Sequence, residues 1–185
     1  MYERVAILLV AWFCGGMAGA VQDAAGVATT QNVTLEHGAF GLDMWAMSAH
    51  RPRGGANARR RPCLNALIAQ RVATGYEASK FEVCGAVTSV PTIINYTIGK
   101  GQQQRTVIAM AFGMGVRKVV VDFGSRGRRV VSPRRLSAAT AKEVGLIQFR
   151  FAAIALAGSN CLHSVVGKEA DGSTAIDEHF RGCHR

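Results

Sequence analysis

The sequence lacks the short motifs that identify several common classes of enzyme. Its 185 residues contain no G-x-S-x-G, no H-E-x-x-H and no paired C-x-x-C. Hydrolase, metalloprotease and thioredoxin-like functions therefore have no support. Residues 99–101 (GKG) also lack the spacing and the Lys-Ser or Lys-Thr pair of a phosphate-binding loop. The sequence indicates no catalytic residue, no metal site and no cofactor.

A long apolar run is missing as well. Residues 5–17 are apolar, but they fall short of the roughly 20 residues that a membrane-spanning helix needs. The small residues Ala18 and Ala20 follow, as in a signal peptide cleaved after Ala20. We expect residues 1–20 to be a signal peptide, the mature chain to have no transmembrane segment, and the protein to be secreted or at the cell surface. An uncleaved N-terminal anchor is the alternative, and the final residues FRGCHR lack the hydrophobic tail of a lipid-anchor signal.

Aromatic residues make up only 7% of the chain, and they are not interleaved with its arginines. Single-stranded bases stack on such aromatics, so nucleic acid is not an expected partner. Hydrophobic residues amount to 49% and charged residues to 18%, which excludes a disordered acidic tail. The length allows one domain, or one domain with a disordered arm, and excludes a multi-domain enzyme.

Acidic residues are scarce relative to basic ones. Asp and Glu number 12 against 22 Lys and Arg, and 17 of these cations are arginines, which make planar contacts with phosphates, sulfates and carboxylates. Residues 51–61 hold five arginines without an acid, and residues 117–135 hold seven cations against Asp122. We expect the second cluster to bind an anionic ligand or a protein partner, with a merely solvated face as the alternative. Its members are Arg117, Lys118, Arg126, Arg128, Arg129, Arg134 and Arg135.

Four cysteines remain once Cys14 is removed with the signal peptide. In an oxidising compartment an even number predicts two disulfides, and three pairings are possible. We favour local closure of Cys63 with Cys84 and of Cys161 with Cys183, each contributing roughly 3 kcal/mol to stability. Free buried thiols are the alternative if the chain is not exported.

The predicted fold class is α+β, an antiparallel meander with flanking helices stapled by disulfides. Residues 21–62 are predicted to be a flexible, arginine-rich arm, and residues 63–185 are predicted to form a single domain. Leu64, Leu67, Ile68 and Val72 recur at helical spacing, which predicts a helix over residues 63–74 ended by Gly75.

Glycine-rich turns divide the apolar runs that follow. The predicted strands are residues 81–87, 92–98, 105–112, 116–123 and 128–131. A second helix is expected over residues 138–144, opened by Ser132-Pro133 or by a capping box at Thr140 and Glu143. Residues 146–156 fit a strand after a break at Gly145, with helix continuation as the alternative, and residues 158–185 read as an irregular tail.

Several smaller patterns remain open. Cys161, His163, His179, Cys183 and His184 are metal-capable, but export would oxidise the thiols and a C-x-H step is tighter than the usual zinc spacing. Surface histidines are therefore the preferred interpretation. Asn32 and Asn95 begin N-x-T glycosylation acceptors, which matter only in a eukaryotic source.

One segment resembles a known family. Residues 62–81 (PCLNALIAQRVATGYEASKF) resemble the first helix of the coccidian sporozoite surface antigens of the TA4 type. The resemblance implies a signal peptide, disulfides, a layered α-β-α fold similar to the CAP superfamily, and a role in host-cell attachment or immune exposure. It covers about 20 residues and extends to neither a hydrophobic C-terminal anchor signal nor a catalytic residue. The matching residues are Cys63, Leu64, Leu67, Arg71, Ala73, Gly75 and Phe81.

Together these patterns predict a secreted or surface-exposed binding protein without a catalytic role, similar to a surface antigen, that contacts anionic host or cell-surface ligands. The alternative is a small basic secreted enzyme or toxin, such as a nuclease, that uses His163 or His179 with a nearby carboxylate. A reading frame whose product folds poorly is the third interpretation. The ligand and the oligomeric state are left open.

Overall fold

A computed structural model describes residues 32–52, 62–85, 91–158 and 160–180. This part of the chain is almost entirely β-structure, with one short α-helix and two 3-10 helices. In chain order the elements are β1 (Asn32–Phe40), β2 (Asp43–His50), β3 (Cys63–Val72), β4 (Gly75–Cys84), β5 (Thr92–Ile98), η3 (Gly101–Gln103), β6 (Arg105–Phe112), β7 (Lys118–Asp122), η4 (Gly124–Arg126), β8 (Arg128–Val131), β9 (Arg134–Arg135), α1 (Ala138–Glu143), β10 (Arg150–Ala157), β11 (Ser164–Lys168) and β12 (Thr174–His179).

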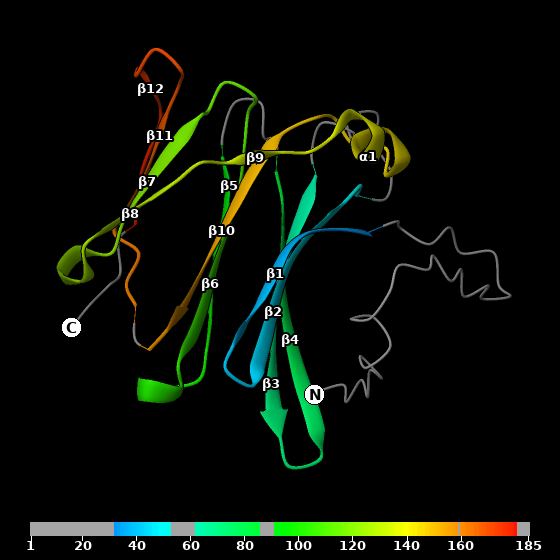
Figure 1. The fold of residues 1–185 in the computed structure, drawn as a ribbon, viewed down its shortest axis with the longest axis vertical. Helices are drawn as coiled ribbons and strands as arrows, with labels where there is room; N and C mark the ends of the chain where they lie inside the picture. The colour runs from blue at the N-terminus through cyan, green and yellow to red at the C-terminus, as the bar shows by residue number, and fades with distance from the viewer. Residues whose placement is uncertain (1–31, 53–61, 86–90, 159, 181–185) are drawn as a thin grey trace, which may run out of the picture.

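The strands form three antiparallel sheets of four strands each (Figure 1). Sheet A is the meander β1-β2-β3-β4, sheet B has the order β5-β6-β10-β9, and sheet C has the order β12-β11-β7-β8. The predicted α+β class is therefore wrong. No helix in the described residues is long and apolar enough to cross a membrane.

Sheet B is the middle of three layers. Side chains alternate along a strand, so β6 sends Val107 and Ala109 to one face and Ile108 and Met110 to the other. The first pair packs with the apolar face of sheet A, and the second pair packs with sheet C. Every residue of β6 after Arg105 is consequently buried. Figure 1 shows β6 and β10 between the other two sheets.

The helix predicted over residues 63–74 is wrong, because the segment is strand β3, an interior strand of sheet A. Leu64, Ala66 and Ile68 enter the core shared with sheet B, while Cys63 and Asn65 lie on the opposite face and are also buried. A strand buried on both faces shows no simple polar and apolar alternation, and its apolar residues coincided with helical spacing.

Two segments expected to be irregular are regular strands. Residues 32–50, placed in the flexible arm, form β1 and β2 of sheet A, joined at Gly41, whose φ of 66° lies in the left-handed region that suits glycine. Residues 164–179, placed in the irregular tail, contribute β11 and β12 to sheet C. The arginine-rich residues 53–61 and the expected signal peptide lie outside the described residues.

Other predicted elements agree with the structure. Strands β5, β6 and β8 have the predicted bounds, β7 lies within its predicted range, and β10 follows the break at Gly145. Helix α1 lies in residues 138–144, but Ser137 caps it by accepting a hydrogen bond from the Thr140 backbone N–H. The predicted pairing of Cys63 with Cys84 is confirmed as a disulfide between β3 and β4.

Candidate functional site

The seven predicted anion-binding residues are all exposed, but they do not form one surface. Arg117 and Lys118 lie at the start of β7, where Lys118 pairs across the sheet with Lys168. Arg134 and Arg135 make up β9 on the edge of sheet B. Arg126, Arg128 and Arg129 surround the turn from η4 into β8. The structure therefore divides the cluster into three groups.

Most of the arginines near β8 and β9 are held by neighbouring groups. The Arg134 guanidinium lies 3.2 Å from Glu36 and 5.3 Å from the Phe151 ring centre. Arg135 donates to Gln148 Oε1 at 2.6 Å, and Arg126 donates to Asn160 Oδ1 at 3.2 Å. Arg128 donates to Asp122 at 2.9 Å. These contacts position the side chains on the fold and limit the number that are free for a ligand.

Arg129 differs from its neighbours because its guanidinium makes no hydrogen bond or ion pair with the described residues. It lines a groove of about 490 Å³ together with Val130 and Val131 of β8. The opposite wall consists of Ala153, Ile154 and Ala155 of β10. The groove thus combines one available cation with two short stretches of strand.

The groove follows the edges of two strands. Ile154 packs between sheets B and C, whereas Ala153 and Ala155 pack toward sheet A. The groove is lined by all three residues, which point to both faces of β10, so it must lie at the edge of this strand. Strand β9 pairs with β10 only at Arg150 and Phe151, and the rest of this edge has no strand beside it among the described residues. Strand β8 likewise ends sheet C. Edges of this kind present unpaired backbone N–H and C=O groups.

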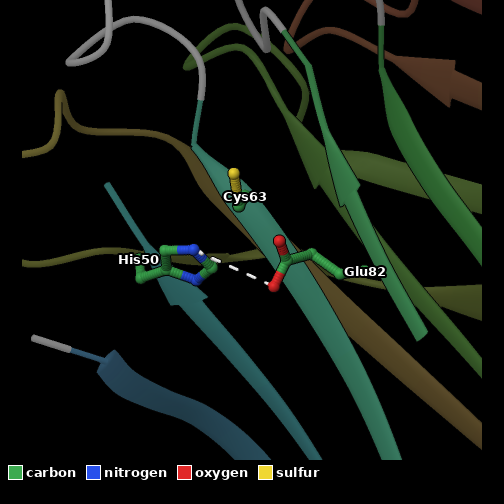
Figure 2. A group of neighbouring side chains, drawn as sticks. All are labelled: His50, Cys63 and Glu82. Carbon is green, nitrogen blue, oxygen red and sulfur yellow. Dashed lines mark ion pairs between the residues drawn. The ribbon is translucent and has the colours of Figure 1, made fainter. Parts of the chain in front are cut away.

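A second group of polar side chains lies at the end of sheet A (Figure 2). His50 of β2 pairs in register with Cys63 of β3, which pairs with Cys84 of β4. Glu82 lies two residues before Cys84, and its Oε2 is 3.9 Å from His50 Nε2. Ligand-type atoms of His50, Cys63 and Glu82 all lie within 4.8 Å of one another. Neighbouring strands thus bring an imidazole, a cysteine sulfur and a carboxylate together.

The surroundings of His50 favour its neutral form. Its side chain is 13% exposed, and burial lowers the pKa of His50 below the ordinary value, against the opposing effect of the Glu82 carboxylate. Asn65 Nδ2 lies 3.2 Å from His50 Nδ1 and 3.4 Å from Ser48 Oγ. Asn65 is 3% exposed, and its Oδ1 is buried without a hydrogen-bond partner among the described residues. A buried amide oxygen of this kind is uncommon in folded proteins.

The remaining predicted residues lie apart from both places. Asn32 begins β1 and Asn95 lies in β5, and both are exposed. Cys161 is disulfide-bonded, but Cys183 lies outside the described residues, so their pairing stays a prediction. His179 Nε2 lies 3.1 Å from Asp177 Oδ1 on β12, with both side chains largely exposed. His163 is exposed beside Gly124.

His50, Glu82 and the β10 edge were not predicted from the sequence. His50 and Glu82 are 32 positions apart, and only the registers of β2, β3 and β4 bring them together. One signal in the sequence would have placed His50 on a strand. It is the alternation over residues 45–50 of Trp45, Met47 and Ala49 with Ala46, Ser48 and His50. Nothing in the sequence shows how far β9 extends along β10.

Comparisons of the chain with protein-family models, with curated proteins and with solved structures found no match. The resemblance to coccidian surface antigens therefore stays a prediction. Its residues 62–81 form most of the β3-β4 hairpin, which differs from the expected first helix.

Proposed function

We propose that the protein is an exported, non-enzymatic binding protein that takes an extended acidic peptide into the groove between β8 and β10. The observation that carries the proposal is the position of Arg129 beside the part of the β10 edge that no described strand covers, with no partner for its guanidinium among the described residues. An extended peptide that adds to a sheet edge gains main-chain hydrogen bonds, and its alternate side chains give specificity. A carboxylate on such a peptide forms a charge-assisted hydrogen bond with the Arg129 guanidinium.

The charge around the groove supports an acidic partner. Arg126 approaches the end of β10, where its guanidinium nitrogens are within about 3.7 Å of a side chain placed on Gly158. Arg134 and Arg135 lie at the opposite end on β9. The groove therefore has arginines at both ends and Arg129 between them. Export to an oxidising compartment is part of the proposal, and the Cys63–Cys84 disulfide supports it.

The test measures binding of a labelled peptide of alternating Glu and Val residues by fluorescence anisotropy. Arg129→Glu is expected to weaken binding at least about tenfold, because one charge-assisted contact becomes a repulsion. Arg117→Glu is the matched control, since it changes the net charge equally at the far end of β7 and should have a much smaller effect.

A second peptide separates edge pairing from general charge attraction. Proline has no backbone N–H, so a peptide with the same Glu residues but Pro in place of Val cannot pair with β10. It should bind much more weakly. Equal binding of both peptides, or equal losses in Arg129→Glu and Arg117→Glu, would show diffuse electrostatic attraction and contradict the proposal.

A further inference from the structure

We propose that the Cys63–Cys84 disulfide is the oxidised form of a redox-controlled metal site. On reduction, the two cysteine thiolates bind a divalent cation of the zinc type together with His50 and Glu82. The site lies on the face of sheet A that is turned away from sheet B, so it is independent of the proposed peptide groove.

The four groups form a complete ligand set for such a cation. Zinc is bound tetrahedrally by thiolate, imidazole and carboxylate at about 2.0–2.3 Å, which places ligand atoms roughly 3.3–3.8 Å apart. The atoms of His50, Cys63 and Glu82 already lie within 4.8 Å of one another. The Cα atoms of Cys63 and Cys84 are 3.9 Å apart in direct cross-strand register, so the second thiolate stays beside the first. To close the set, Glu82 Oε2 exchanges its ion pair with Lys80 Nζ, 3.0 Å away, for the cation.

Asn65 is placed to orient the His50 ring toward a ligand. Its amide contacts His50 Nδ1, and its buried Oδ1 has no partner among the described residues. The two ends of an amide are interchangeable in shape. Turned over, Oδ1 accepts a hydrogen bond from His50 Nδ1–H and leaves Nε2 free for the cation. Metal-binding histidines are commonly oriented in this way by a partner on the other ring nitrogen.

The redox step needs a dithiol reductant. One thiolate of the reductant attacks a sulfur of the Cys63–Cys84 bond, and its second thiolate resolves the mixed disulfide. Two electrons pass to the protein, two cysteine thiols form, and the reductant leaves as a disulfide. The thiols release their protons to solvent when the cation binds. Cys84 lies exposed on edge strand β4, where a reductant has access, whereas Cys63 is buried.

The experiment uses the full chain with Co²⁺ as the probe, before and after reduction by a water-soluble phosphine, which leaves no competing thiol. Cobalt in a tetrahedral site with thiolate ligands shows thiolate-to-metal absorption in the near ultraviolet and intense visible bands. We expect these bands only in the reduced protein, with one Co²⁺ bound and displaced by Zn²⁺. Cys161→Ser/Cys183→Ser should retain the bands, and Cys63→Ser/Cys84→Ser should lose them.

Two further variants keep both cysteines and test the other ligands. His50→Ala and Glu82→Gln should each weaken Co²⁺ binding at least about tenfold. His179→Ala, a substitution on exposed strand β12, should have no effect. Far-ultraviolet circular dichroism shows whether each reduced protein keeps its sheets.

Several outcomes overturn the proposal. These are equal bands in the oxidised protein, no bands in a folded reduced protein, or unchanged affinity in both His50→Ala and Glu82→Gln. A reduced chain that loses its sheets and does not regain them with Co²⁺ also overturns it. The peptide-binding test is run on the oxidised protein, so failure here leaves the proposed function unaffected.

Discussion

Arg105 and Asp43 form an ion pair that joins the first two layers of the protein. Arg105 begins β6 of sheet B, Asp43 begins β2 of sheet A, and Nε lies 3.1 Å from Oδ2. The two side chains are 19% and 15% exposed, so water screens them only in part. Asp43 also accepts a hydrogen bond from the Arg71 backbone N–H, and the Arg105 guanidinium lies 5.9 Å from the Phe40 ring centre. The pair thus ties β2 and β3 to β6.

Replacing Asp43 should therefore destabilise the fold. Asp43→Ala leaves the partly buried Arg105 and the Arg71 N–H without their acceptor, which we expect to cost about 2 kcal/mol. Urea unfolding measures the loss. Asp177→Ala is the control, since it removes an exposed ion pair with His179 and should cost less than about 1 kcal/mol. Equal effects of the two changes would contradict a structural role for the Asp43 pair.

Asp122 should make stability depend on pH in the acid range. The Gly124 backbone N–H and then the Arg128 guanidinium hydrogen-bond its carboxylate, and they hold the pKa of Asp122 below its ordinary value. Because the folded-state pKa is the lower one, this stabilisation is fully present above the unfolded-state pKa of about 3.9. It is lost as the pH falls through the folded-state pKa.

A carboxyl NMR titration of Asp122 should consequently show a midpoint below that of an unfolded peptide. Arg128→Ala removes the second cause and leaves the Gly124 N–H, so the midpoint should rise only part of the way. In urea unfolding, Asp122→Asn should lower stability at neutral pH, and the difference from the parent protein should shrink in acid. An Asp122 midpoint at the unfolded-peptide value would refute the prediction.

A side chain at Gly124 should destabilise the fold. Its φ is 61°, and a Cβ there would lie 2.6 Å from His163 Nε2. We expect Gly124→Ala to cost about 1–2 kcal/mol in backbone strain, with a further loss from the contact with His163. Gly41→Ala is the matched control, because its φ is nearly the same (66°) but no atom lies within 4 Å of the added Cβ. Urea unfolding should show a larger loss at Gly124, and His163→Ala in that background should recover the difference.

Strands that are bounded by clear turn residues could be predicted from the sequence. Strands whose residue pattern depends on burial between layers or on a pairing partner could not. Strands β5, β6 and β8 follow turn or loop residues such as Gly99 and Gly127, and their bounds were correct. Strand β3 was misassigned because both of its faces are buried, which removes the alternation typical of a strand. Strands β11 and β12 are short and lie in polar, glycine-containing sequence, and their structure depends on pairing of β11 with β7 and of β12 with β11.

The candidate sites show the same dependence on tertiary structure. The sequence shows a cluster of cations over residues 117–135, but composition does not distinguish Arg134, which is held by Glu36 and Phe151, from Arg129, whose guanidinium has no partner among the described residues. The pairing of Cys63 with Cys84 was the favoured one of three possible pairings, on the ground of local closure. The positions of His50 and Glu82 beside it follow only from strand register.

The central position of sheet B has a consequence for the order of folding. Sheet A can assemble from consecutive hairpins, but β6 meets its partner β10 only after β7, β8, β9 and α1, with Arg105 opposite Ala157. Long-range pairing of this kind is slow. During synthesis, the apolar face of sheet A therefore remains incompletely covered until residue 157 has emerged from the ribosome. We expect the nascent chain to be most prone to aggregation in that interval.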